Sequence, residues 1–330
     1  MGYGYTFIKS QLFTQIPYPQ SSFSGQTVIV TGSNTGLGLE AARHIVRLDA
    51  TKVILAVRTV SKGQAAAANI IESLNVPSSR VEVWQLDLSS HESVIAFGKR
   101  VQSLDRLDAV IQNAGILTYE WNIVEGEESH IAINVVSPIL FGLLVLPKLR
   151  ETAKATGQSG RLAFVGSDLH YIAKFKEAGV SGSMFDALRQ KEIADMGDRY
   201  KVSKLLLLYA VRELAARNPL SSSSNVIIDY LTPGACKSDI FRDDLSYVQR
   251  LGIGIGTALM ARTTEVGSRT LVHGVSSDVG EEAHGAFLMD CRVFPNGTNV
   301  DSERGQSLQK LWTQELFERL ELIEPGCTTA

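Results

Sequence analysis

The stretch that decides the fold is QTVIVTGSNTGLGLEAARHIV, residues 26–46. An apolar, β-branched run at 26–30 leads into a loop with three glycines, and residues 39–46 then have helical spacing. Glycine lets a backbone turn tightly and approach a pyrophosphate, whose charge the free N–H groups of a helix N-terminus favour. A strand, loop and helix in this order predict nucleotide binding, with a plain glycine-rich turn as the alternative. The absence of a following Gly-Lys-Ser/Thr excludes an NTPase loop. The loop residues expected to hold the nucleotide are Gly32, Ser33, Asn34, Gly36, Leu37 and Gly38.

Strand patterns and helical patterns alternate along the rest of the chain. Further strands are predicted at 52–57, 81–86, 109–111, 161–165, 226–230 and 285–289, and further helices at 63–74, 131–149, 200–216 and 308–322. Apolar strands that alternate with helices are typical of a parallel sheet covered on both faces. The sequence therefore predicts an α/β fold, a single doubly wound Rossmann domain whose seven-stranded, mainly parallel sheet carries helices on both faces. We expect this domain at 24–325, after an N-terminal extension at 1–23 and before a tail at 326–330.

The composition excludes several classes of protein. The chain has 330 residues, of which 44% are hydrophobic and 20% charged, and its net charge is -3. It lacks the basic excess of a nucleic-acid binder. Its 3 cysteines have no C-x-x-C spacing, which predicts a reducing compartment and no disulfide framework, zinc site or other metal site. Neither a secretory signal nor a run of about 18 apolar residues is present, so we expect a cytoplasmic protein without a membrane span. Peripheral contact with a membrane stays open.

The end of the second strand indicates which dinucleotide binds. NAD sites place an Asp or Glu there, which accepts a hydrogen bond from the ribose 2′-hydroxyl. Here the strand ends at Arg58, and Lys62 follows four residues later. A guanidinium at this point pairs with a 2′-phosphate, so NADP(H) is the predicted cofactor. The alternative is that both cations are solvated loop charges. Further cofactor contacts are expected where the third and fourth strands end, at Asp87, Leu88, Asn113, Ala114 and Gly115. Asp87 also fits the N-cap of the next helix.

Two side chains four residues apart indicate acid–base chemistry. Tyr200 and Lys204 fall on one face of the helix predicted at 200–216, about one turn apart. A phenol has a pKa of about 10 and is a poor base at neutral pH. A neighbouring ammonium favours the phenolate, so we expect Lys204 to lower the pKa of Tyr200. The spacing alone is common, but it gains weight from Ser167, which ends the fifth strand with a hydroxyl able to bond a substrate carbonyl oxygen.

Together these motifs resemble those of the short-chain dehydrogenase/reductase family, from about residue 24 to residue 322. The matching positions are the loop from Thr31 to Gly38, Asn113-Ala114-Gly115, Asn134, Ser167, Tyr200, Lys204 and Pro233-Gly234. The retinol-dehydrogenase-like branch is the most similar, through stretches at 57–63, 125–134, 284–291 and 308–312. Within this resemblance, a fungal-type reductase of specialised metabolism is a further expectation.

The resemblance implies a role for each of these residues. A reduced nicotinamide passes hydride to a carbonyl carbon, and Tyr200 supplies the proton to the oxygen. Ser167 orients that oxygen, Lys204 binds the nicotinamide ribose, and Asn134 holds a water that links Lys204 to solvent. The residues that lie beside the nicotinamide are Pro233, Gly234 and Ser238. Because Pro138 lacks an N–H, we also expect the Asn134 carbonyl oxygen to stay free for that water.

The substrate side is less fixed by the sequence. A lid is expected at about 239–264, where aliphatic side chains are interspersed with glycines. The residues expected to line the substrate pocket are His170, Tyr171 and Phe241. These features predict an NADPH-dependent oxidoreductase that reduces a ketone or aldehyde of a fairly large apolar compound to an alcohol, reversibly. The family often dimerises through its two long helices, so a homodimer is also expected.

Two other functions stay open. A chain that kept the fold and lost turnover would be an NADP-binding regulatory or scaffold protein, although the intact Ser-Tyr-Lys set argues against this reading. A reductase of a conjugated carbon–carbon double bond would use the same cofactor site. Its product would be a saturated ketone rather than an alcohol.

Overall fold

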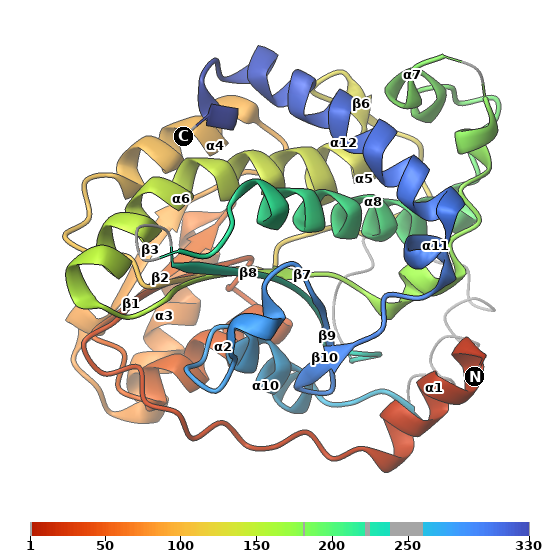
Figure 1. Cartoon of the computed structure of the whole chain (residues 1–330). Helices are drawn as coiled ribbons and strands as arrows, with labels where there is room; N and C mark the ends of the chain where they lie inside the picture. Colours follow the sequence, from red (N-terminus) through yellow and green to blue (C-terminus); the bar gives the residue numbers. More distant parts are fainter. Residues whose placement is uncertain (1, 181, 222–224, 238–259, 330) are drawn as a thin grey trace.

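The computed structural model describes residues 2–180, 182–221, 225–237 and 260–329 (Figure 1). A large twisted sheet crosses the centre of the molecule, and helices cover it from both sides. Ser238 and Phe241 lie outside the described residues, as does most of the lid expected at 239–264.

The large sheet has the strand order β10-β9-β8-β7-β4-β1-β2-β3. Neighbouring strands pair in parallel, except that β9 and β10 are antiparallel. Its members are β1 (Thr27–Thr31), β2 (Lys52–Val57), β3 (Val81–Gln85), β4 (Ala109–Gln112), β7 (Gly160–Val165), β8 (Val226–Thr232), β9 (Phe287–Met289) and β10 (Arg292–Phe294). A separate small hairpin joins β5 (Ile123–Val124) to β6 (Glu127–Glu128). The strand order reverses between β1 and β4, so a ligand crevice is expected at their carboxyl ends.

The predicted doubly wound α/β architecture is confirmed, but the count of seven strands is one too few. The additional strand is β10, which returns from β9 through a tight turn at Asp290 and Cys291, with φ of 53° and 58°. Three residues are too short a run for an alternating pattern to stand out in the sequence. β10 extends the sheet with its only antiparallel pair among the described strands.

The helices form two layers. One face of the sheet packs against α2 (Gly36–Arg47), α3 (Val60–Leu74) and α10 (Thr264–Gly274). The opposite face packs against α4 (His91–Val101), α6 (Ser137–Thr156), α8 (Met196–Arg217) and α12 (Glu303–Ile323). The shorter helices and turns are α1 (Tyr3–Ile8), η1 (Lys9–Phe13), η2 (Ser78–Arg80), α5 (Ser129–Ile131), η3 (Ala132–Val136), η4 (Asp168–Ile172), η5 (Lys176–Gly179), α7 (Met184–Leu188), η6 (Glu281–Ala283), α11 (Thr298–Asp301) and η7 (Cys327–Thr329). Figure 1 shows α6, α8 and α12 above the sheet and α2 and α10 below it.

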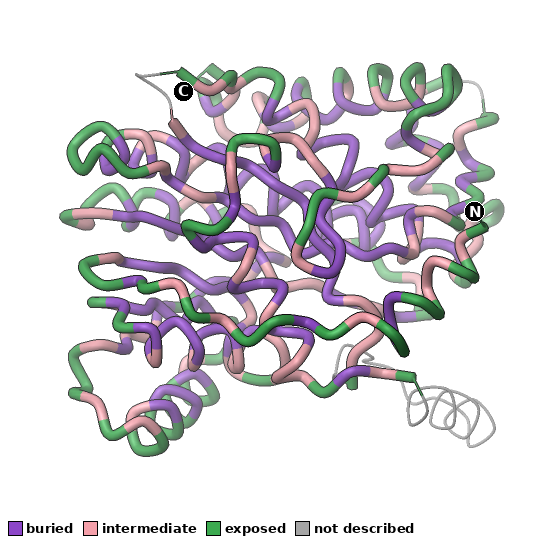
Figure 2. Tube along the Cα trace, turned by 60° about the horizontal axis from the view of Figure 1, so that its bottom comes forward, coloured by how far each residue is buried: buried purple, intermediate pink, exposed green. Residues whose placement is uncertain are grey.

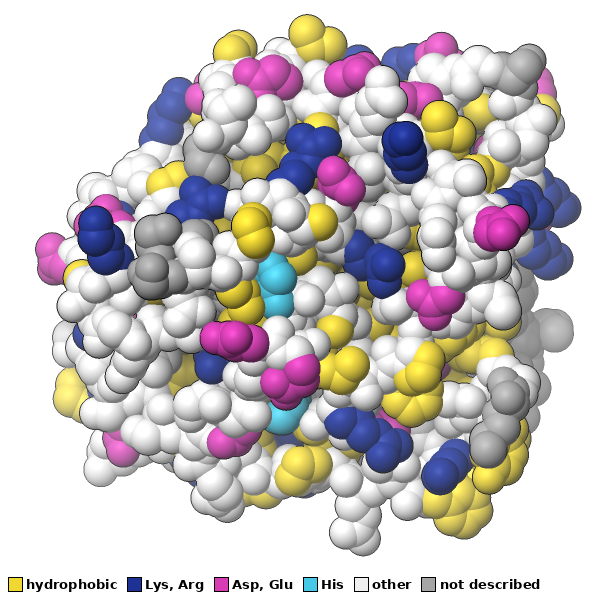
Figure 3. All heavy atoms as spheres, in the orientation of Figure 1, with side chains coloured by type: hydrophobic (Ala, Val, Ile, Leu, Met, Phe, Trp, Pro, Cys, Tyr) yellow, Lys and Arg dark blue, Asp and Glu magenta, His cyan; other side chains and the backbone are white. Residues whose placement is uncertain are grey.

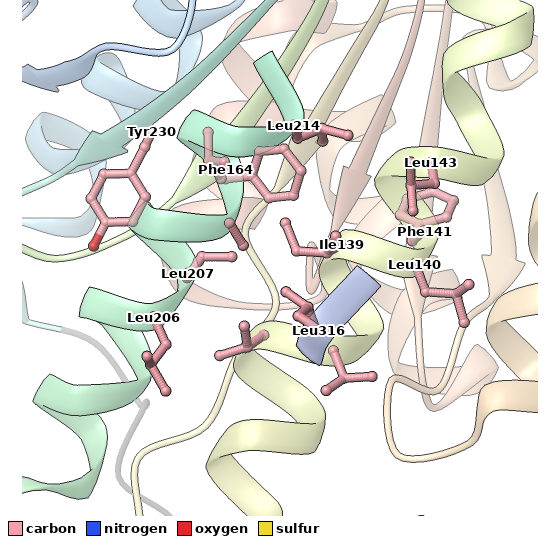
Figure 4. Packing of buried hydrophobic residues seen from close by; sticks show 14 of the residues in the cluster. Ile139, Leu140, Phe141, Leu143, Phe164, Leu206, Leu207, Leu214, Tyr230 and Leu316 are labelled. Atoms are coloured by element: carbon pink, nitrogen blue, oxygen red, sulfur yellow. The ribbon is translucent and has the colours of Figure 1, made fainter. Parts of the chain in front are cut away.

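Burial follows these layers, and Figure 2 shows the strands as the buried centre of the chain. Figure 4 shows how Phe164 of β7 and Tyr230 of β8 meet leucines of α8 and Ile139 of α6. The continuous helix at 129–156 is long and apolar enough to cross a membrane, but 94% of its most apolar window is buried inside the fold. This helix is therefore a core helix of the fold, which explains its apolar sequence.

The N-terminal residues lie along the surface of the Rossmann domain. Beyond α1 and η1, Arg269 of α10 donates to the Ile16 carbonyl oxygen at 2.9 Å, and Arg47 of α2 donates to the Pro19 carbonyl oxygen at 2.7 Å. These contacts hold the extended stretch against the helices below the sheet. On the face shown in Figure 3, basic and acidic side chains are interspersed rather than gathered in one patch, in keeping with the small net charge of -3.

Candidate active site

A cavity of about 260 Å³ lies at the carboxyl ends of β1, β2, β3 and β4. The strand order reverses at this point, as it does in doubly wound sheets that bind nucleotides. The predicted cofactor residues that line it are Gly32, Asn34, Gly36, Leu37, Arg58, Lys62, Asp87, Leu88, Asn113, Ala114 and Gly115. The sequence analysis missed Thr35, Ala56, Thr59, Leu86, Ser89 and Ile133. Most of these adjoin a predicted residue in the chain, and Ile133 comes from η3.

The glycine loop is braced by the end of β4. Gly32 has a φ of 64°, in the region that favours glycine, and a Cβ there would lie 3.0 Å from the Ala114 Cα. The Asn113 amide nitrogen donates to the Thr31 carbonyl oxygen at 3.0 Å, and the Ala114 N–H donates to the Thr31 hydroxyl at 2.9 Å. A side chain at Gly32 would push the two loops apart and fill the space at their junction.

Two predicted loop residues shape the loop without lining the cavity. Ser33 is buried, and its hydroxyl donates to the Val30 carbonyl oxygen at 2.8 Å. A Cβ at Gly38 would lie 2.6 Å from both the Asn113 amide nitrogen and the Gly32 carbonyl oxygen. Gly38 is therefore required for α2 to begin this close to the loop.

Positive charge stands at the rim of the cavity. Arg58, which directly follows β2, and Lys62, in the first turns of α3, are both exposed. Within the described residues, no ion pair involves either of them. No carboxylate occupies the end of β2, so the charge there suits an anionic group of a bound ligand.

Asp87 lines the cavity and does not cap the next helix. Its carboxylate accepts from the N–H and the hydroxyl of Ser89, at 2.9 and 2.6 Å. The N-cap of α4 is Ser90, whose hydroxyl accepts from the Ser93 N–H at 3.2 Å. The capping alternative for Asp87 is therefore wrong, because the N-cap lies three residues later and α4 begins at His91.

The three predicted catalytic side chains meet at the carboxyl end of β7. Ser167 follows this strand, while Tyr200 and Lys204 lie one turn apart on α8. The Ser167 side chain lies beside the Tyr200 phenol and favours its charged form, which lowers the pKa of the phenol. The Lys204 Nζ lies 5.7 Å from the centroid of the Tyr200 ring and donates to the Val165 carbonyl oxygen at 2.9 Å. Ring, hydroxyl and ammonium thus share one corner of the fold, in which Ser167 and Lys204 are buried and Tyr200 is half-buried.

The expected lowering of the Tyr200 pKa by Lys204 is wrong for this structure. Burial and the nearby Asp168 carboxylate raise the pKa of the phenol above its usual value, which the Ser167 side chain only partly offsets. Burial also lowers the pKa of Lys204 to about 8. The reason is that a desolvated site disfavours both charged forms, the phenolate and the ammonium. The phenol is therefore a proton donor at neutral pH.

Asn134 links the catalytic corner to the cavity. Its side-chain amide accepts from the Ile116 N–H at 2.8 Å and donates to the Ile116 carbonyl oxygen at 3.0 Å and to the Ser203 hydroxyl at 3.1 Å. A Cβ at Gly115 would lie 3.0 Å from the Asn134 Oδ1 and 3.7 Å from the Lys204 Nζ. A side chain at this position would crowd the Asn134 amide, which a glycine avoids.

The helix is irregular around Asn134, in η3. This π-helical turn ends just before α6, whose second residue is Pro138. A missing N–H at Pro138 removes one backbone bond of an α-helix, which favours such a local widening. That the Asn134 carbonyl oxygen is free to bind a water stays a prediction.

Tyr230, which the sequence analysis did not single out, fixes the backbone of Ser167. Its hydroxyl accepts from the Ser167 N–H at 2.9 Å and lies 3.1 Å from the carbonyl oxygens of Ser167 and Lys204. The Tyr230 ring packs so closely on Gly166 that a Cβ there would lie 1.8 Å from the ring. The only signal in the sequence was a tyrosine within a mostly aliphatic strand, which gives no indication of its partner.

Of the predicted substrate-lining residues, His170 does not face open space. It is fully buried, and its two ring nitrogens lie 2.7 Å from the Ser167 carbonyl oxygen and 3.0 Å from the Asn296 carbonyl oxygen. These contacts hold the loop after β7 in place, and contact of His170 with a substrate stays a prediction. Tyr171 is half-buried and stacks on the His170 ring at 4.5 Å between centroids. Its contact with substrate stays a prediction.

Pro233 and Gly234 follow β8 and lie against the N-terminal segment. The Pro233 carbonyl oxygen accepts from Arg262 at 3.1 Å. Gly234 has a φ of 73°, and a Cβ there would lie 2.2 Å from the side-chain nitrogen of Gln11. Neither residue lines the cavity between β1 and β4.

Comparison with known proteins places this site in a family. A family model described as short chain dehydrogenase matches residues 26–177. The short chain dehydrogenase/reductase dmxR8 of Cryptosporiopsis sp. is 40% identical over 327 residues, which cover 98% of this chain and 99% of that protein. The short chain dehydrogenase atnD of Emericella nidulans is 44% identical over 287 residues, covering 86% of this chain and 90% of that protein.

A solved structure with a similar fold is also described as a short chain dehydrogenase. A short chain dehydrogenase from Shigella flexneri, solved in complex with NADP, superposes with a TM-score of 0.60 at 20% identity, covering 83% of this chain and 100% of that chain. The predicted family is confirmed, whereas the retinol-dehydrogenase-like branch stays a prediction. With a relative 40% identical along nearly its whole length, the chain belongs to the short-chain dehydrogenase/reductase family of oxidoreductases.

Proposed function

We propose that the chain is an NADP(H)-dependent reductase that converts a ketone or aldehyde to an alcohol and also catalyses the reverse oxidation. The observation that carries this proposal is the placement of Ser167 beside the Tyr200 phenol, with Lys204 one helical turn away. A carbonyl reduction needs a proton donor and a second hydrogen bond on the same oxygen. In this proposal Tyr200 is the proton donor, and the neighbouring Ser167 provides the second hydrogen bond.

Each side chain has a distinct task. Tyr200 gives its proton to the oxygen of the reduced carbonyl, and its raised pKa keeps that proton in place at neutral pH until the oxygen becomes basic. Ser167 donates a hydrogen bond to the same oxygen and orients it. Lys204 stabilises the phenolate that remains, because an ammonium nearby favours the charged phenol. Asn134 holds the neighbouring backbone, through its contacts to Ile116.

The cavity residues fit NADP(H) as the cofactor. The absence of a side chain at Gly32 lets the glycine loop pack closely on Ala114, and the same loop lines the cavity in which a pyrophosphate would lie. Arg58 and Lys62 stand where a ribose 2′-phosphate would need cations. Asp87 offers a carboxylate to the adenine amino group. When bound, the reduced cofactor supplies the hydride for the carbonyl carbon. The NADP complex of the Shigella flexneri relative supports this assignment.

The decisive experiment compares Tyr200→Phe with the parent enzyme. We expect the variant to lose NADPH oxidation with carbonyl substrates by about 100-fold or more, since it lacks the proton donor. Tyr5→Phe, on an exposed tyrosine, is the matched control and should keep the parent rate. An unchanged rate in Tyr200→Phe contradicts the catalytic assignment.

Product analysis separates the other two functions. An alcohol identified by mass and by its chemical shifts supports carbonyl reduction, whereas a saturated ketone indicates reduction of a carbon–carbon double bond. A parent protein that binds NADPH but converts no member of a broad carbonyl panel would be the regulatory or scaffold protein.

The substrate is proposed to be a fairly large apolar carbonyl compound of specialised metabolism. Its support is the aromatic surface beside Ser167, where Tyr171 stacks between Tyr3 and His170, and the kinship with dehydrogenases from fungi such as Emericella nidulans. The test is an NADPH-oxidation screen that compares apolar ketones and aldehydes with small polar ones. Faster turnover of the small polar compounds would contradict the proposal.

A cytoplasmic location and a homodimer complete the proposal. The apolar stretch from Leu205 to Leu208 gives no support to dimerisation, because it is buried within the chain and α12 packs on α8. Sedimentation analysis of the purified protein decides the oligomeric state.

A further inference from the structure

The N-terminal helical segment, residues 3–13 of α1 and η1, contacts the loop that carries Ser167. The Tyr3 hydroxyl donates to the Asp168 carboxylate at 3.1 Å, across 165 residues of sequence. The Tyr3 ring also lies 5.9 Å from the Tyr171 ring between centroids. Figure 1 shows α1 at the end of the sheet where β9 and β10 meet the loops below α11. The first helix of the chain therefore reaches the residue next to the catalytic serine.

A second contact anchors the other end of this segment. The Ser10 hydroxyl donates to the Asp290 carboxylate at 2.8 Å. Arg262 donates to the Ser10 carbonyl oxygen and to the same carboxylate, at 2.7 Å each. All three residues are buried. The segment is thus fixed at both ends and packs as part of the fold.

Asp168 is an unusual neighbour for a catalytic serine. Its side chain is buried, with 6% of the residue exposed, and its other carboxylate oxygen accepts from the Thr232 hydroxyl at 3.3 Å. In the described part of the chain no cation pairs with it, since Arg262 pairs with Asp290 instead. The Tyr3 hydroxyl is therefore one of two side-chain donors that stabilise this buried carboxylate, and it comes from outside the Rossmann domain.

We propose that Tyr3 and Asp168 form a positioning pair through which the N-terminal helical segment acts on the proton transfer by Tyr200. The proposal rests on the proposed function, and it adds a residue pair that the catalytic set does not contain. The physical link is charge: a carboxylate beside Tyr200 disfavours the phenolate. Burial raises the pKa of Asp168, and the hydrogen bond from Tyr3 opposes this by favouring the ionised carboxylate.

The ionisable groups around the pair are shared between several elements. Those that face Asp168 are Tyr3, Tyr171, Tyr200, Tyr230, Cys236 and Asp290. Those that face Tyr200 are Asp168, His130, Lys204 and Tyr230. Among the groups around Tyr200, Asp168 is the carboxylate that acts on the phenol. Removing its charge should therefore lower the pKa of Tyr200.

The experiment measures the pH dependence of kcat/KM for alcohol oxidation with NADP+, in which Tyr200 must be deprotonated. Asp168→Asn removes the charge and keeps the shape, so the rising limb of the profile should move to lower pH by about one unit. Tyr3→Phe removes the donor, which favours neutral Asp168, so the limb should move in the same direction by less. In the Asp168→Asn background, Tyr3→Phe should add no shift. Tyr5→Phe, on the exposed face of the same helix, should leave the profile at its parent position.

Two results would overturn the pair. In the first, the rising limb of the pH profile keeps its parent position in Asp168→Asn. In the second, Tyr3→Phe shifts that limb equally in the parent and in the Asp168→Asn background. The ionisation of Tyr200 is also followed without turnover, by the near-ultraviolet absorbance of its phenolate in the NADP+ complex, with Tyr200→Phe as the blank. If the titration shows the expected shifts but the protein oxidises no alcohol, the proposed function is refuted and the proposed Tyr3–Asp168 pair is not.

Discussion

Tyr230→Phe removes one oxygen atom that holds the catalytic serine, and its effect can be worked out from the contacts. The hydroxyl is the acceptor for the buried Ser167 N–H at 2.9 Å and lies 3.1 Å from two carbonyl oxygens. Without it, that N–H loses its partner in a place water does not reach. A buried donor left unpaired costs about 1–3 kcal/mol, so the free energy of unfolding should fall by this amount. For a chain of this size the melting temperature should fall by about 1–4 °C.

The activity should fall further than the stability loss explains. Ser167 lies beside the Tyr200 phenol, so a displaced serine misplaces both groups on the reacting oxygen. We expect kcat for carbonyl reduction to fall by about tenfold or more, with a smaller change in the KM for NADPH. Steady-state kinetics with NADPH absorbance and thermal unfolding measure the two effects.

The matched control is Tyr209→Phe. Tyr209 is also fully buried, and its hydroxyl donates to the Asn299 carbonyl oxygen at 2.5 Å, in a contact between α8 and α11. Its loss should lower the melting temperature similarly and leave kcat near the parent value. If Tyr230→Phe keeps the parent kcat while it loses stability like the control, the hydroxyl does not position Ser167 and the reasoning is refuted.

Three further perturbations test other parts of the structure. Gly166→Ala should lower the free energy of unfolding by about 3 kcal/mol, because its Cβ would overlap the Tyr230 ring, while Gly179→Ala, with open space, should change stability little in the same thermal melts. Lys204→Met should melt at a higher temperature than the parent at pH 7, since burial lowers the pKa of Lys204 from 10.5 to about 8 and the folded state carries a desolvated ammonium below that pH. Between these two pKa values the unfolded chain binds more protons at Lys204 than the folded chain, so the parent becomes more stable as the pH rises. Above both values the difference in melting temperature between variant and parent should vanish. A lower melting temperature for Lys204→Met than for the parent at pH 7 would contradict this prediction. Arg58→Asp should weaken NADPH binding, measured by fluorescence titration, far more than NADH binding, and equal losses would count against recognition of a 2′-phosphate.

Local sequence patterns were enough to predict much of the fold and many of the residues that line the nucleotide cavity. The glycine loop from Thr31 to Gly38 is decided by residues adjacent in sequence, because its turn, its positive φ angles and its helix start are local properties. The same holds for Arg58 and Asp87, since a parallel strand delivers the residue that follows it to the same edge of the sheet. The pairing of Tyr200 with Lys204 depends only on helical periodicity.

What the sequence could not provide depends on contacts between distant segments. Tyr230 reaches Ser167 because β8 lies beside β7, and no local pattern marks a tyrosine in a strand as a hydrogen-bond partner. The sign of the pKa change at Tyr200 depends on burial, which spacing on a helix does not reveal. The contact of Tyr3 with Asp168 joins the first turn of the chain to its middle, so the extension at 1–23 gave no hint of a role.

The place of α1 has a practical consequence for production of the protein. Tyr3 sits beside the loop of Ser167, whereas the last helix, α12, ends on the far side of the molecule (Figure 1). An affinity tag or fusion partner attached ahead of Tyr3 would therefore crowd the loop that carries Ser167. Recombinant material meant for enzymology should carry its purification handle after residue 330, or lose an upstream handle by proteolytic cleavage before assays begin.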